Sequence, residues 1–178
     1  MKLTNKEISN YAQKFLNEDK TNKDITSMYF IDKKQRVKAE FLSEEQIILS
    51  GLDLVLEIFK SKCKNFKIIK KNRDGNKINK NQKILVIEAN ARDILSIERT
   101  TLNIFQHFSG ISTLTNKFCK KIKYTKAIIL DTRKTTPGLR KLEKYATHIG
   151  GARNHRLDLS ERFMIKDNHL IASSDIFE

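Results

Sequence analysis

Two short apolar runs in the C-terminal half restrict the fold more than any other feature of this sequence. AIILD spans residues 127–131 and FMI spans residues 163–165, and polar side chains follow each run at once. A short apolar run bounded by charge is typical of a strand buried in a parallel sheet. LRKLEKYA, which follows Pro137 and Gly138, predicts a helix between the two strands. This order of strand, helix and strand indicates either a β/α barrel or a doubly wound sheet.

In both architectures, ligands bind where the strands end. The side chains at these two strand ends are Thr132, Arg133, Lys134 and Lys166. Arginine offers a planar fork that suits a carboxylate or a phosphate, and lysine adds a compact positive charge, so the pattern favours an anion site. Internal ion pairs are the alternative. Arg133 would then pair with Asp131 or Asp167, and Lys166 would pair with Asp167 or Glu161.

The segment GGARNHR adds His155 and Arg156 to this candidate site. Two adjacent residues can face one ligand only from a loop, and a simple surface turn is the alternative interpretation. Five of the nine arginines fall within residues 133–162, and all four histidines follow residue 106. The net charge of +14 favours anionic partners, although the heavy use of Lys, Ile and Asn could be a general compositional bias.

The N-terminal half alternates helix and strand signals. Thr4 and Glu7 form a capping box before a helix that should end near residues 17–20. Ser43 and Gln46 form a second such box, which predicts a helix over residues 44–60. Strands are expected at SMYFI, VKAEF, FKIIK and KILVIEA, with a turn over residues 72–76 between the last two. A long helix from residue 90, interrupted near Ser109 and Gly110, places a domain boundary near residue 92 and divides the chain into domains 1–92 and 93–178.

Residues 60–83 carry ten basic side chains and one acidic side chain. A nucleic-acid-binding stripe is one interpretation, but a sheet edge guarded by lysines is more common, and only Phe66 is available to stack on bases. No apolar run approaches the roughly 18 residues that cross a bilayer, so a membrane protein is not expected. The N-terminus has no signal-peptide stretch, and Cys63 and Cys119 fit neither a disulfide framework nor a metal site. These features favour a reducing, cytoplasmic location.

Four sequence blocks occur in order along the chain: ERTTLNIFQHFSGIST, DTRKTTPGLRKLEKYA, GGARNHR and MIKDNH. Together with EDKTNKDITS and SGLDLVLEIF, they closely resemble the quinolinate phosphoribosyltransferases, also called carboxylating nicotinate-nucleotide pyrophosphorylases. Lys23 departs from the glycine usual in that family, which affects a turn and not the chemistry. The resemblance implies an α/β fold, with an N-terminal α/β sandwich domain followed by the first part of an incomplete β/α barrel.

The resemblance also implies an activity of NAD biosynthesis. The family makes nicotinate mononucleotide, pyrophosphate and CO2 from quinolinate and phosphoribosyl pyrophosphate, with Mg2+ bound alongside the phosphates. Its members are homodimers or larger, and one arginine, which Arg99 matches here, reaches the site from the neighbouring subunit. The other matching positions are Thr132, Arg133 and Lys134 for the quinolinate-binding strand end, His155 and Arg156 for the N-H-R pair, and Lys166 for the lysine of I-K-D-N-H.

Family members continue well beyond residue 178, through barrel units that supply acidic residues and glycine-rich phosphate loops. We therefore expect a fragment or a truncated copy, with unpaired strand edges, exposed apolar faces and little or no turnover by the isolated chain. The alternatives are a non-catalytic family member that still dimerises and binds quinolinate, the related pyrophosphorylase-like protein of molybdenum transport genes, and, least favoured, a basic nucleic-acid-binding module.

Overall fold

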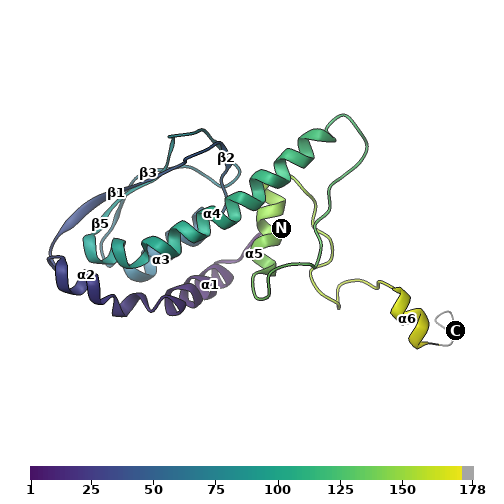
Figure 1. Cartoon of the computed structure of the whole chain (residues 1–178), viewed down its shortest axis with the longest axis horizontal. Helices are drawn as coiled ribbons and strands as arrows, with labels where there is room; N and C mark the ends of the chain where they lie inside the picture. The colour runs from purple at the N-terminus through teal and green to yellow at the C-terminus, as the bar shows by residue number, and fades with distance from the viewer. Residues whose placement is uncertain (174–178) are drawn as a thin grey trace.

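The computed structural model describes residues 1–173 (Figure 1). The last five residues of the expected second domain lie outside this range. The elements in chain order are α1 (Asn5–Glu18), the short 3-10 helix η1 (Thr21–Lys23), α2 (Ile25–Phe30), β1 (Arg36–Leu42), β2 (Ile47–Ile48), α3 (Leu52–Lys62), β3 (Lys67–Lys71), β4 (Lys77–Ile78), β5 (Lys83–Asn90), α4 (Ala91–Lys121), α5 (Arg140–Ile149) and α6 (Asp167–Ala172). The fold is therefore a mixture of helices and strands, as expected.

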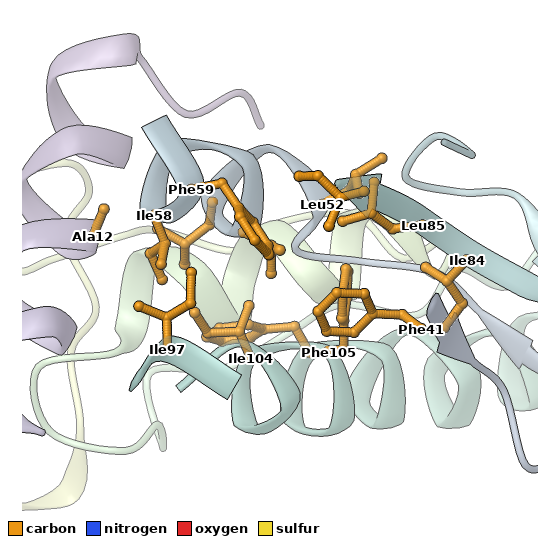
Figure 2. Close-up of a cluster of buried hydrophobic side chains, with 14 of the residues drawn as sticks. Ala12, Phe41, Leu52, Ile58, Phe59, Ile84, Leu85, Ile97, Ile104 and Phe105 are labelled. Carbon is orange, nitrogen blue, oxygen red and sulfur yellow. The ribbon is translucent and has the colours of Figure 1, made fainter. Parts of the chain in front are cut away.

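One three-stranded sheet and the helices beside it enclose the main core. The strand order is β1-β5-β3, and both neighbours of β5 run antiparallel to it. Figure 2 shows side chains of α3, α4 and the sheet pointing toward one another in this core. The Phe41 ring of β1 lies edge-on to Phe59 of α3 and to Phe105 of α4, with ring centroids 6.3 and 5.4 Å apart. Such pairs add about 0.5–1.5 kcal/mol each beyond the burial of their area.

The predicted first helix is confirmed, together with its cap. The Thr4 hydroxyl accepts a hydrogen bond from the Glu7 amide (3.3 Å), and the Glu7 carboxylate accepts one from the Thr4 amide (2.9 Å). The predicted strands VKAEF, FKIIK and KILVIEA correspond to β1, β3 and β5. Local capping specifies the first helix, and an alternating pattern of burial specifies β1.

The predicted helix over residues 44–60 is wrong at its start. Ile47 and Ile48 instead form β2, which pairs with β4, and α3 begins only after Gly51. Gly51 has a φ of +99°, a left-handed conformation that side-chain-bearing residues rarely adopt. Asp74, from the turn after β3, caps α3 by accepting hydrogen bonds from the amides of Gly51 and Leu52, both at 2.9 Å. The cap thus comes from a distant segment, and the Ser43–Gln46 box is not used.

Two further expectations are corrected. The first four residues of SMYFI are helical in α2 because Asp24 caps that turn by accepting a hydrogen bond from the Ser27 amide (3.1 Å). The long helix α4 is not interrupted at Ser109 and Gly110. The buried Ser109 hydroxyl accepts a hydrogen bond from the Ser50 amide (3.1 Å) and donates one to the Ser50 carbonyl (3.3 Å), so a tertiary contact supports the helix there.

The two apolar runs of the C-terminal half do not form the buried strands that were predicted. In the first, only Leu130 makes a β-bridge, which is parallel and pairs with Arg153. In the second, Phe163 is fully exposed and belongs to no strand. A strand needs a neighbouring strand with which to form its backbone hydrogen bonds, and among residues 1–173 these segments find only the single bridge. Exposed apolar side chains, such as Ile128 and Ile165, are the expected consequence.

The basic stretch over residues 60–83 contains an edge strand. β3 lies at the edge of the sheet and all of its residues are exposed, including Lys67, Lys70 and Lys71. Lysines at such an edge oppose pairing with a strand of another molecule. None of the helices within residues 1–173 is long and apolar enough to cross a membrane.

Candidate active site

A parallel bridge brings the two candidate loops together. The Arg153 amide donates to the Ile129 carbonyl (2.9 Å), and the Asp131 amide donates to the Arg153 carbonyl (3.2 Å). Residues 132–134 and residues 154–156 therefore leave this bridge side by side. The sequence pattern predicts both loops in one site, but it carries no signal for the contact that joins them.

A buried carboxylate lies at the junction of these loops. Asp131 forms an ion pair with Lys144 of α5, and the exposed fractions of the two side chains are 4% and 1%. The same carboxylate accepts hydrogen bonds from the His155 amide (2.7 Å) and from the Asn154 side-chain amide (2.6 Å). The Thr147 hydroxyl donates to it more weakly, at 3.4 Å. Lys144 is therefore the ion-pair partner of Asp131, and the alternative pairing with Arg133 is not formed.

Arg133 of the first loop and Arg156 of the second each carry a buried nitrogen without a partner in residues 1–173. Arg156 is 5% exposed, and its Nη1 donates to the Arg162 carbonyl (2.7 Å). The Nε atoms of Arg133 and Arg156 are buried, and no group in residues 1–173 accepts a hydrogen bond from them. A buried donor left unpaired costs about 1–3 kcal/mol, and more when it is charged. These two guanidinium groups are consequently suited to an anionic ligand that would accept those bonds.

His155 has one ring nitrogen committed within its own loop. The Arg156 amide donates to His155 Nδ1 (2.8 Å). Nδ1 must therefore be unprotonated, so a neutral His155 carries its proton on Nε2 and can donate from that atom.

Thr132 and Lys134 are exposed on the first loop. The Lys134 amide donates to the Thr132 hydroxyl (3.0 Å), which closes the loop into a tight turn. Both residues line a pocket of about 340 Å³ between this loop, α4 and α5. The remaining lining residues are His107, Ile111, Asp131, Thr135, Glu143, Lys144 and Thr147.

Glu143 fixes the loop that follows. Its carboxylate accepts a hydrogen bond from the Thr136 amide (3.1 Å) and lies 3.1 Å from His107 Nε2 on α4. Burial opposes the ionisation of Glu143, but the bonds from Thr136 and His107 outweigh it and lower its pKa below the ordinary value. Glu143, Lys144 and His107 were not predicted as site residues, because their spacing on the helices is that of ordinary amphipathic positions.

Arg99 and Lys166 are not brought to this site within the chain. Arg99 is exposed on α4, eight residues before His107, which is about 12 Å along the helix axis. Lys166 is exposed at the start of α6, which lies at the end of an extended segment away from the sheet and the long helices (Figure 1). Among residues 1–173 it forms no ion pair with Asp167 or Glu161, the partners considered as alternatives.

No metal centre is evident in the described part of the chain. Within residues 1–173, no three His, Cys, Asp or Glu side chains come close enough to hold a metal ion. Because Mg2+ binds through several oxygen ligands, these residues alone do not fit a magnesium site, and no chemical step is assigned to one here.

Comparison with known proteins identifies the family. The family model described as the quinolinate phosphoribosyl transferase N-terminal domain matches residues 24–109, and the model for the C-terminal domain matches residues 111–178. The two models meet inside α4, so the domain boundary near residue 92 stays a prediction.

Individual relatives give the same result. The chain is 37% identical to the carboxylating nicotinate-nucleotide pyrophosphorylase of Mycobacterium leprae, over 87% of this chain and 55% of that protein. It is 38% identical to the probable enzyme of that name from Bacillus subtilis, over 92% of this chain and 56% of that one. The solved nicotinate-nucleotide pyrophosphorylase of Francisella tularensis matches with a TM-score of 0.90 and 37% identity, over 97% of this chain and 61% of that one.

The chain thus spans about half the length of the curated relatives that it matches. The two family models cover most of its residues, and they follow one another in the order of the family's two domains. The chain therefore belongs to the quinolinate phosphoribosyl transferase family.

Proposed function

We propose that this chain carries the quinolinate-binding part of a carboxylating nicotinate-nucleotide pyrophosphorylase. The observation on which the proposal rests is the pair of buried, unpartnered guanidinium nitrogens of Arg133 and Arg156, on two loops that a parallel bridge joins. Quinolinate is a pyridine with two adjacent carboxylates. Guanidinium groups pair well with carboxylates, often through two hydrogen bonds at once.

The other site residues complete this proposal. Thr132 and Lys134 would contact the same dianion from the exposed side of the first loop, and His155 would donate from Nε2. Arg99 is exposed on α4, so a partner subunit could place its own copy of this side chain at the site. Lys166 keeps its expected role only if the segment before α6 lies closer to the loops in the active enzyme. We accordingly propose a homodimer, and α2 exposes an apolar surface beside α4 that suits one: Ile25, Met28, Tyr29 and Phe30.

In the proposed reaction, the ring nitrogen of quinolinate attacks C1 of phosphoribosyl pyrophosphate and pyrophosphate leaves with the bonding electrons. The 2-carboxylate then departs as CO2. The electron pair left on the ring carbon is stabilised by the adjacent positive nitrogen, and a proton takes the place of the carboxylate. The cations of this chain hold the two anions together and oppose their repulsion, so catalysis rests on positioning and charge stabilisation. Mg2+ would arrive with the phosphates of the cosubstrate.

A second function, binding without turnover, is favoured by one observation. The chain spans about half the length of the curated relatives that it matches. Under this second proposal, titration shows quinolinate binding and a product assay shows no nicotinate mononucleotide. We place this activity in the cytoplasm, since both cysteines are free.

Calorimetric titration with quinolinate tests the proposal. Arg133→Ala should weaken binding about 10- to 150-fold, which is the loss of a hydrogen bond to a charged group of about 1.5–3 kcal/mol. Arg153→Ala is the matched control, because it removes an exposed cation of the second loop and tests for a general effect of charge. Equal affinity of the Arg133→Ala variant and the unchanged protein would contradict the proposed site, as would unfolding of that variant alone.

A further inference from the structure

The ion pair between Asp131 and Lys144 is buried more completely than any other ion pair in residues 1–173. Removing two charges from water is costly, and replacing a buried pair by well-packed neutral residues is often neutral or stabilising. Stability alone is therefore a weak reason for a pair at this place. Both side chains line the pocket beside the first loop, but they are only 4% and 1% exposed and their charged groups are paired with each other.

The contacts of the pair join three segments of the candidate site. Asp131 directly precedes Thr132. Its carboxylate accepts a hydrogen bond from the amide of His155 (2.7 Å), the residue directly before Arg156. The Asn154 side-chain amide donates both to this carboxylate (2.6 Å) and to the Lys144 carbonyl of α5 (2.8 Å). The pair thus sets the separation and orientation of both cation-bearing loops relative to one helix.

We propose that Asp131 and Lys144 are positioning residues for the dianion site, which act by holding the two loops in register without contacting the ligand. This inference rests on the proposed function and deepens it. The carboxylate is needed because one acceptor group must satisfy a lysine, a backbone amide and a side-chain amide together. An asparagine offers only one acceptor oxygen, and its own amide group would face the Asn154 amide, donor against donor.

The test separates positioning from stability. Asp131→Asn and Lys144→Met each leave one buried charge or donor unpaired, so each single variant should lower the Tm. The double variant removes both charges and should recover most of that Tm loss. We expect the double variant to bind quinolinate at least about tenfold more weakly in calorimetry, because the loops are no longer held in register. Recovery of both the Tm and the affinity of the unchanged protein would overturn the proposal.

Lys141→Met is the matched control on the same helix. Lys141 pairs with Glu7 of α1, so this variant also removes a lysine–carboxylate pair from α5, but a pair that includes no residue of the two loops. Its quinolinate affinity should be unchanged, and an equal loss of affinity there would assign the effect to α5 in general. If the double variant does not fold, Asp131→Glu keeps the charge and moves the carboxylate by one methylene. Affinity equal to that of the unchanged protein in that folded variant would count against positioning.

Hydrogen exchange separates a failure of this inference from a failure of the proposed function. If the unchanged chain does not bind quinolinate, the proposed function fails, but the positioning claim is still tested by the His155 amide. Exchange of this amide should become much faster in the Asp131→Asn variant, or in the double variant if that one folds better. The amides of α3 and α4 should exchange as before. Unchanged exchange at His155 would show that the pair does not hold this loop.

Discussion

Removing the Tyr145 hydroxyl should weaken the junction between α5 and the start of α3. Tyr145 donates a hydrogen bond to the Asp74 carboxylate (2.9 Å), and the same carboxylate caps α3 through the amides of Gly51 and Leu52. A hydrogen bond to a charged group contributes about 1.5–3 kcal/mol, and partial exposure of this site favours the lower end. For a chain of this size, Tyr145→Phe should therefore lower the Tm by about 3–6 °C at neutral pH.

The pH dependence of this loss follows from the Asp74 carboxyl. Burial raises its pKa above the ordinary 3.8, although the bonds from Leu52, Gly51 and Tyr145 oppose the rise. The native state therefore binds a proton more readily than the unfolded state. The contribution of Asp74 to stability falls as the pH rises through the interval between 3.8 and the raised pKa of the folded state. Without the Tyr145 hydroxyl the pKa of Asp74 rises further. The loss of Tm in Tyr145→Phe should therefore be largest at pH values above this interval and smaller at acid pH.

Thermal unfolding of the two proteins between pH 3 and pH 8 measures this difference. Tyr124→Phe is the control, because the Tyr124 side chain is exposed and should leave the Tm unchanged at every pH. A Tyr145→Phe deficit that is absent at neutral pH, or that grows as the pH falls, would refute the reasoning about Asp74.

Two further predictions concern packing and thiol reactivity. Gly150→Ala should be strongly destabilising in denaturant unfolding, by about 1–3 kcal/mol or more, because the new Cβ would lie 2.6 Å from the Ser112 carbonyl oxygen. Gly110→Ala, in open space within α4, should instead stabilise the protein by about 0.5–1 kcal/mol. A change in the free energy of unfolding of the same sign for both variants would contradict the packing of α5 on α4. Burial raises the pKa of the Cys63 thiol to about 12, so a thiol-specific reagent at pH 8 should modify the half-buried Cys119 first. Equal rates for the two native thiols would contradict the burial of Cys63.

Local signals in the sequence predicted those parts of the structure that local physics determines. The Thr4 cap depends on near neighbours and the strand β1 on alternation, and both form where expected. The start of α3 depends on Asp74, which lies more than twenty residues away and carries no sequence signal of its own. The apolar run at residues 127–131 has the composition of a buried strand, but a strand forms only with partners, and it finds one bridge.

The candidate site shows the same division. The proximity of residues 132–134 and 155–156 could be predicted because positive charges at the ends of expected strands favour one common anion site. Their role in binding an anion stays a prediction. The buried pair of Asp131 and Lys144 could not be predicted, because no spacing rule connects a residue before a loop with one inside a distant helix. Arg99 was assigned by resemblance alone, and Lys166 both by its position after the FMI run and by resemblance. The roles of these two residues also stay predictions.

Discrimination between a dicarboxylate and a monocarboxylate tests the central claim most directly. The measurement is calorimetric titration of the 178-residue chain with quinolinate and, separately, with nicotinate, which lacks the 2-carboxylate. If the guanidinium groups of Arg133 and Arg156 converge on a doubly negative pyridine, quinolinate should bind with one-to-one stoichiometry and nicotinate about tenfold or more weakly. Equal affinity for both ligands, or no heat with either, would contradict the account.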